Sequence, residues 1–138
     1  MNIQGHWTGI VVYGKTYRKH KFKQLIFEMD ITQDSEKISG KANDISGVGV
    51  NPDPASIEGT FIDGKIKFVK QYPSFHYYDR GETKNDKSRL GGLIYYSGEL
   101  EENAETLSGK WFIRDKIKIF GIIPISLSNR GTWTMHRK

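Results

Sequence analysis

A glycine recurs in the middle of six short segments that alternate apolar and polar residues. The segments are HWTGI at 6–10, ISGK at 38–41, IEGTF at 57–61, YSGEL at 96–100, LSGKW at 107–111 and NRGTW at 129–133. A glycine inside a strand has no side chain to pack and weakens the strand, so its repetition needs a structural reason. Along residues 107–113, Leu107, Gly109, Trp111 and Ile113 share one face, which places the glycine on the apolar side. We expect these glycines to face a core, where they allow the strands to coil and leave room for large aromatic side chains.

Period-two alternation over most of the chain predicts eight strands, and no window holds the apolar stripe of a helix. The expected strands lie near 5–13, 23–32, 36–43, 55–62, 65–72, 92–101, 105–119 and 125–137. Short turn-forming links such as IDGK between them indicate antiparallel neighbours. The predicted fold is therefore an all-β, eight-stranded antiparallel up-and-down β-barrel. A β-sandwich is the alternative, because evenly spaced short strands suit it as well.

Composition limits the classes of protein that such a fold can belong to. The chain has 138 residues, 27% of them charged, and no cysteine. This suits one domain over residues 1–138 that has no disulfide, thiolate metal site or cysteine nucleophile. The N-terminus carries no secretory pattern, and no run of about 18 apolar residues occurs. We expect a cytoplasmic protein with no membrane span.

A basic run lies between the first two expected strands, in GKTYRKHKFK. Its charged members are Lys15, Arg18, Lys19, Lys21 and Lys23, in a chain of net charge +5. Such a run can attract phosphates or an anionic membrane, or it can be a solvated hairpin loop. No nucleic-acid-binding motif accompanies it, so nucleic acid is not the expected partner.

The first and last strands resemble those of the lipocalins and related calycins. GHW at 5–7 is similar to the Gly-x-Trp that opens the first strand in that superfamily, where a basic residue of the last strand packs over the tryptophan. Arg137 is expected in that role because it shares the inward parity of Trp133 and Met135, and Arg130 is the alternative. The glycine pattern from residue 38 onward also resembles a calycin-like module. The resemblance implies a small barrel and carries no chemistry with it.

Three ligand types of this superfamily match the residues poorly. Nine residues separate Tyr13 from Lys23, too few and too basic for the helix pair of fatty-acid-binding proteins. Gly9 stands where avidins place a polar ligand contact, which argues against biotin. Haem needs an inward histidine, whereas His136 points outward by parity and His76 falls in an expected loop. No cofactor is therefore expected.

The expected interior has one polar end. The inward parity of Ile66 and Phe68 continues to Lys70 and Tyr72. A buried ammonium without a partner is costly, so Lys70 should reach the barrel rim, pair with a carboxylate or meet an anionic ligand.

We therefore predict a site for a small apolar or amphipathic molecule, with an amphipathic acid as one candidate ligand. The predicted ligand contacts are Trp7, Tyr13, Lys70, Tyr72, Tyr96, Trp111 and Trp133. Side chains can equally fill a barrel of this size. The chain shows no Ser-His-Asp, HExxH or GxxxxGK[ST] pattern, so no catalytic or metal-binding residue is predicted. The alternative function is a non-catalytic interaction scaffold that acts through its loops.

Two segments extend beyond the expected barrel. Residues 73–90 exceed an ordinary hairpin loop and are expected to form a mobile connection over one barrel end. The last two expected strands should form a hairpin through residues 115–128 that is longer than its neighbours, with Phe120, Ile122 and Ile123 at an apolar tip. This tip can plug the barrel, line a ligand portal or form the contact of a homo-oligomer.

Overall fold

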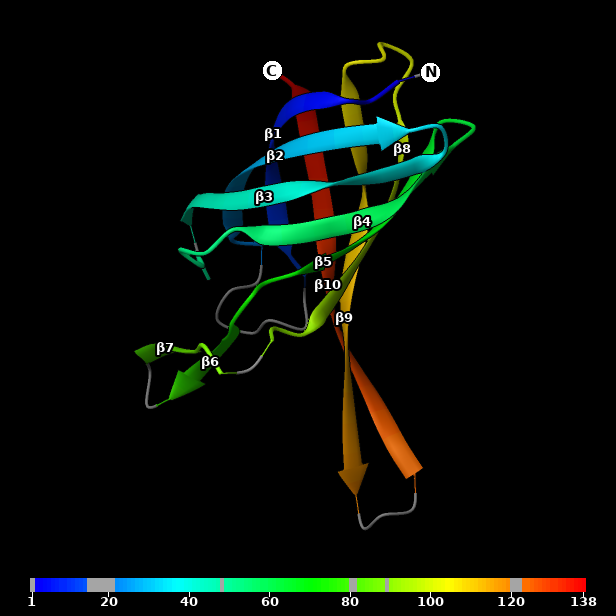
Figure 1. The fold of residues 1–138 in the computed structure, drawn as a ribbon. Coiled ribbons are helices and arrows are strands. Elements are labelled where there is room, and N and C mark those ends of the chain that lie inside the picture. Colours follow the sequence, from blue (N-terminus) through cyan, green and yellow to red (C-terminus); the bar gives the residue numbers. More distant parts are fainter. Residues whose placement is uncertain (1, 15–21, 48, 80–81, 89, 120–122) are drawn as a thin grey trace.

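The structure is a computed structural model that describes residues 2–14, 22–47, 49–79, 82–88, 90–119 and 123–138; within 75–85 and 114–129 it describes the backbone. Eight antiparallel strands form a closed barrel in the order β1-β10-β9-β8-β5-β4-β3-β2 (Figure 1). They are β1 (Gly5–Tyr13), β2 (Gln24–Asp34), β3 (Lys37–Gly47), β4 (Ala55–Ile62), β5 (Lys65–Gln71), β8 (Leu93–Leu100), β9 (Thr106–Ile119) and β10 (Ile123–Arg137). The predicted up-and-down barrel is confirmed, and the sandwich is excluded because β1 pairs with β10 and closes the sheet on itself.

The segment between β5 and β8 was expected to be a connection without strands, but the structure shows two strands in it. β6 (Phe75–Asp79) and β7 (Glu82–Asp86) pair antiparallel as a separate two-stranded sheet. His76 therefore lies in a strand, opposite Asn85, and not in a loop. The segment FHYYD is short and lies just after a proline, so the sequence pattern was too weak to predict this hairpin.

Alternating burial along each strand shows how the sequence specifies the barrel wall. In β2, Leu25, Phe27, Met29 and Ile31 are buried, whereas the residues between them are exposed or half-buried. Residues two apart share a face of a strand, so this alternation places one apolar face inside. The same parity holds across the barrel and defines its core.

The recurring glycines face that core, as predicted. Gly98 and Gly109 lie opposite each other on β8 and β9. A Cβ on Gly98 would lie 2.7 Å from Cζ2 of Trp133, and one on Gly131 would lie 2.7 Å from Nε1 of Trp111. At these two glycines the space that a side chain would occupy is thus filled by a tryptophan ring, that of Trp133 on β10 beside Gly98 on β8 and that of Trp111 on β9 beside Gly131 on β10.

Stacked and edge-on aromatic rings fill the middle of the barrel. The Phe68 and Tyr96 rings stack with centroids 4.6 Å apart, and the Trp133 ring meets Phe68 edge-on at 5.9 Å. Such offset arrangements add to the free energy of apolar burial.

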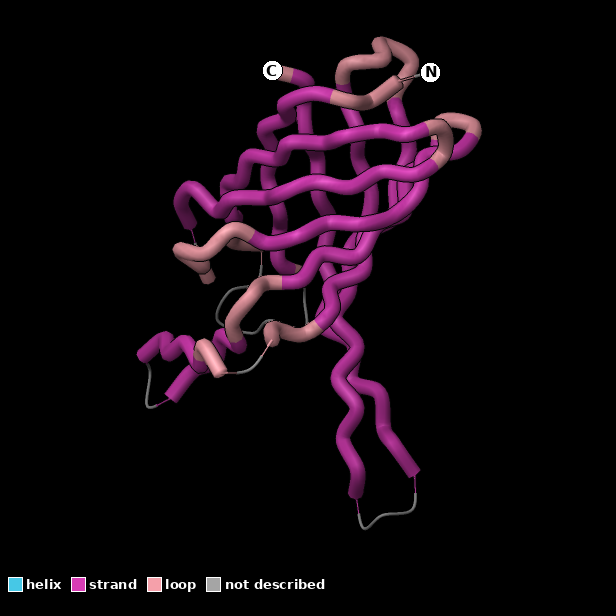
Figure 2. The backbone as a smooth tube through the Cα atoms, viewed as in Figure 1, coloured by secondary structure: helices cyan, strands magenta, loops and turns pink. Residues whose placement is uncertain are grey.

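The two ends of the barrel differ. Both termini lie at one end, where the backbone N–H of Lys138 donates to the carbonyl of His6. The β6–β7 hairpin lies at the other end, as does the part of β9 and β10 that continues past the barrel (Figure 2). The expectation of a long final hairpin is confirmed, since β9 and β10 have 14 and 15 residues and the adjacent β8 has 8.

A valine at Gly109 should destabilise the barrel more than a valine at the adjacent exposed Lys110. A Cβ at Gly109 would lie 2.5 Å from the Cα of Gly98 and closer still to the carbonyl oxygen of Ser97, so strands must move apart. We expect Gly109→Val to lower the free energy of unfolding by about 1–3 kcal/mol or more. Denaturant unfolding of Gly109→Val and Lys110→Val measures the difference, and equal small effects would contradict the inward assignment.

Candidate functional site

A buried ion pair lies inside the barrel at the end opposite the termini. Lys70, near the end of β5, is 1% exposed, and the side chain of Asp44, near the end of β3, is fully buried. Lys70 Nζ lies 3.5 Å from Asp44 Oδ1. Of the three environments expected for an inward lysine, the structure therefore shows pairing with a carboxylate, and the rim position is wrong.

The Asp44 carboxylate accepts hydrogen bonds from two further groups. The hydroxyl of Tyr72 lies 2.8 Å from Oδ1 and 2.7 Å from Oδ2, and the backbone N–H of Asn51 donates to Oδ2 at 2.9 Å. These bonds come from the residue after β5 and from the loop after β3. The carboxylate thus ties together two connections at this barrel end.

Three aromatic rings surround the Lys70 ammonium. Nζ lies 4.8 Å from the centroid of the Tyr72 ring, 5.8 Å from that of Phe27 and 5.9 Å from that of Tyr96. These distances lie within the range of cation–π attraction. The ammonium is therefore held by one carboxylate and several ring faces. We call Lys70, Asp44, Tyr72 and Tyr96 the polar cluster.

Burial shifts the protonation equilibria of the polar cluster. Burial raises the pKa of both Tyr72 and Tyr96 far above the usual range of a phenol, and the charge of Asp44 adds to the shift. Burial alone would lower the pKa of Lys70, but its contacts with Tyr72 and Asp44 raise that pKa overall. At neutral pH the tyrosines are neutral, and Tyr72 acts as a hydrogen-bond donor to Asp44.

Asp44 and Asn51 were missed by the sequence analysis. The inward parity of Ile38, Gly40 and Ala42 continues to Asp44, which was the available signal, but the strand was expected to end at residue 43. Asn51 lies in the loop beyond β3, where no parity applies. The pairing of β2 with β3 also shifts register between Ile26 and Phe27, opposite this end of β3.

The remaining predicted contacts do not gather at one site. Tyr96 belongs to the polar cluster, and the half-buried Tyr13 meets the Trp111 ring edge-on at 5.8 Å. The indole N–H of Trp133 donates to backbone carbonyls of the barrel wall, and that of Trp111 donates to the Thr132 carbonyl. Trp7 lies at the opposite end, where its indole donates to the Ile3 carbonyl. Trp7 and the polar cluster are therefore separate.

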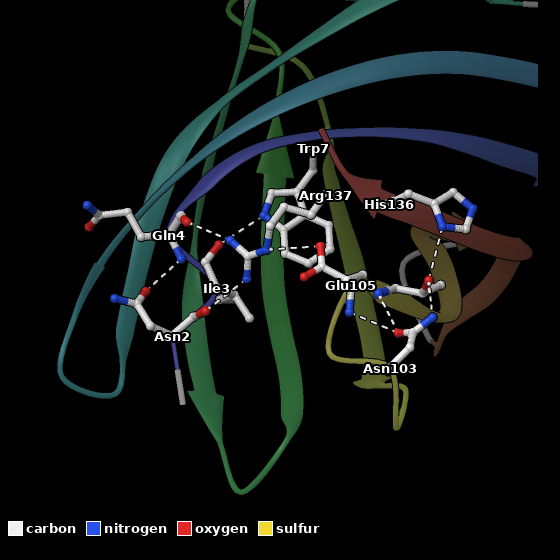
Figure 3. A network of polar contacts seen from close by, with 9 residues as sticks. Asn2, Ile3, Gln4, Trp7, Asn103, Glu105, His136 and Arg137 are labelled. Carbon is white, nitrogen blue, oxygen red and sulfur yellow. Dashed lines mark hydrogen bonds and ion pairs between the residues drawn. The ribbon is translucent and has the colours of Figure 1, made fainter.

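Arg137 covers Trp7 at the end that holds the termini (Figure 3). The guanidinium carbon lies 4.7 Å from the centroid of the Trp7 ring. Its nitrogens donate to the carbonyls of Gln4 at 2.8 Å and Asn2 at 2.9 Å, and Nε lies 3.6 Å from Glu105. The N-terminal residues are thereby held across this end of the barrel.

Several predicted residues fall beyond what the structure describes. Phe120, Ile122 and the basic residues Lys15, Arg18, Lys19 and Lys21 lie outside the described residues. Ile123 pairs with Ile119 through the backbone of β10 and β9. The tip and the basic run stay predictions.

No known protein family model matches the chain, and neither curated proteins nor solved structures give a match. Over the described ranges, no three histidine, aspartate or glutamate side chains gather as metal ligands do. The described chain also holds no helix long and apolar enough to cross a membrane. The fold and the polar cluster are therefore the features that indicate a function.

Removing one charge of the pair should destabilise the protein more than removing both. Lys70→Met leaves the carboxylate of Asp44 buried without its cation, and Asp44→Asn leaves the ammonium unpaired while keeping an oxygen acceptor for Tyr72. Each single variant should lower the free energy of unfolding by about 3–5 kcal/mol, and the double variant should lower it by less than either single variant does. Denaturant unfolding measures this, with exposed Lys67→Met on the same strand as the control. Additive losses would show that the two charges do not depend on each other.

Stability should fall at high pH. Above about pH 10, an unfolded chain releases protons from lysine and tyrosine that Lys70, Tyr72 and Tyr96 retain in the fold, because their pKa values are raised. The folded state then binds more protons, so the free energy of unfolding decreases as pH rises. Unfolding of the wild type and of Tyr96→Phe across alkaline pH tests this, and the variant should lose less stability per pH unit. Parallel profiles would refute it.

Proposed function

We propose that the protein binds a small molecule at the barrel end that contains the polar cluster. The observation that carries this proposal is the fully buried Lys70–Asp44 pair, in a barrel interior otherwise filled by apolar and aromatic side chains. Apolar residues of similar volume are often as stabilising as a buried ion pair or more so. A buried polar cluster with shifted pKa values inside an apolar scaffold is therefore a candidate binding site.

The surroundings of the cluster suit a molecule with an apolar part. Tyr13, Val50, Ile94 and Ile113 are partly buried and pack against the core. Backbone register aligns Ile94 with Lys70 on one side and with Ile113 on the other, so these side chains belong to the same end as the cluster. An amphipathic molecule can meet these apolar groups and bring its polar group to the cluster. The amphipathic acid expected from the sequence is one such molecule.

The experiment is a binding screen of amphipathic molecules, read by fluorescence of the three tryptophans and by native mass spectrometry. Tyr72→Phe removes only the hydroxyl that donates to the Asp44 carboxylate, so the polar cluster is no longer held in place and binding should weaken about tenfold or more. The matched control is Tyr95→Phe on the neighbouring strand β8, whose half-buried ring stacks on Phe112 at 5.1 Å. Equal affinity of the wild type and both variants for every bound molecule would place the site elsewhere.

A second candidate function is interaction with another protein through the end of the β9–β10 hairpin. β9 pairs with β8 only up to Ile113, and β10 pairs with β1 only from Gly131 onward. Among the described residues, 114–119 and 123–128 pair only with each other. Both outer edges of this two-stranded ribbon therefore carry backbone groups that a further strand can use.

Serine at Phe120, Ile122 and Ile123 tests the apolar tip of this hairpin. If the tip forms a contact between copies, the triple variant should change from dimer to monomer in sedimentation or light scattering, because apolar burial drives such contacts. If the tip lines a ligand portal, uptake should change in an unaltered monomer. If the mass in solution, the ligand uptake and the stability all stay unchanged, the tip has no role in either function.

A further inference from the structure

Asn51 is the one described residue with a buried side-chain nitrogen that lacks a hydrogen-bond partner among the described residues. The residue is 2% exposed. Its Oδ1 accepts the backbone N–H of Asp53 at 3.0 Å, which fixes the orientation of the amide. The Nδ2 group is left as a donor with no acceptor. A buried donor without an acceptor is costly, and each such group in a folded protein calls for an explanation.

Asn51 adjoins the polar cluster directly. Its backbone N–H donates to Oδ2 of Asp44, the same oxygen that accepts the Tyr72 hydroxyl. The loop that carries it also passes close to Tyr13, since a Cβ on Gly49 would lie 2.7 Å from the Tyr13 hydroxyl. The unpaired amide therefore lies at the barrel end where the proposed function places the ligand.

The charge of the cluster limits the polar group that can bind there. Lys70 and Asp44 together are neutral, and Tyr72 is a neutral donor to the carboxylate. A ligand carboxylate at this place would add a buried negative charge next to that of Asp44. An uncharged oxygen acceptor meets no such cost and can accept from the Asn51 amide.

We propose that Asn51 Nδ2 donates a hydrogen bond to an uncharged oxygen of the ligand, such as the carbonyl of an amide or ester. This rests on the proposed function, and it narrows the ligand class from amphipathic molecules in general to those with a neutral acceptor. The amphipathic acid is then the disfavoured member of the class.

The first test compares decanamide with decanoate, which share an apolar chain and differ in the charge of the polar group. At neutral pH, the wild type should bind decanamide at least about tenfold more tightly, measured by tryptophan fluorescence and calorimetry. Tighter binding of decanoate would overturn the inference and leave the proposed function standing. If neither compound nor any other amphipathic molecule binds, the proposed function fails and the inference fails with it.

The second test removes only the unpaired donor. Asn51→Asp keeps the oxygen that accepts from Asp53 and replaces Nδ2 by oxygen, so decanamide affinity should fall about tenfold or more. The matched control is Asn43→Asp, which makes the same change at an exposed site on β3. Unaltered decanamide affinity in a folded Asn51→Asp protein would overturn the assignment. If this variant does not fold, Asn51→Ala supplies the same comparison, since it too lacks the donor.

Discussion

Inward-facing glycines allow the close backbone contacts on which this barrel depends. An eight-stranded barrel encloses little volume, and this one contains three tryptophans in its core. Gly98 and Gly131 leave the space that the rings of Trp133 and Trp111 occupy, and the Gly98–Gly109 pair brings β8 and β9 together without side chains between them. A side chain at these glycines would displace both a strand and a tryptophan ring. The glycines therefore specify the backbone of the barrel and the packing of its core together.

The filled middle of the barrel explains why the polar cluster lies at one end. Phe68, Tyr96 and Trp133 form a continuous set of ring contacts, and Lys70 follows Phe68 by two residues on the inner face of β5. Asp44 reaches the same place from β3, so the ammonium is neutralised without leaving the interior.

Period-two alternation was sufficient to predict the fold and the inward direction of Lys70, because one buried face fixes the parity of a whole strand. It was insufficient where strands end. Asp44 shares the parity of Ala42, but a polar residue at the end of a strand is as typical of a turn as of the barrel wall, so the pattern did not show that the strand continues. Asn51 lies in a loop, where burial depends on tertiary contacts with Asp44 and Asp53 that no local pattern contains. The β6–β7 hairpin was not predicted for a related reason, since its strands are short and pair with each other outside the barrel.

The adjacency of the two chain ends has a topological consequence. Lys138 is hydrogen-bonded to His6 through the backbone, while the candidate site lies at the far end of the barrel. A short peptide that joined the two ends would make the polypeptide chain circular and leave the closed sheet intact. The chain could then be opened at another turn to give a circular permutant. Any fusion partner attached at either end would likewise leave from the face remote from Asp44 and Asn51. The architecture thus separates the place where the chain can be extended from the place where a ligand would enter.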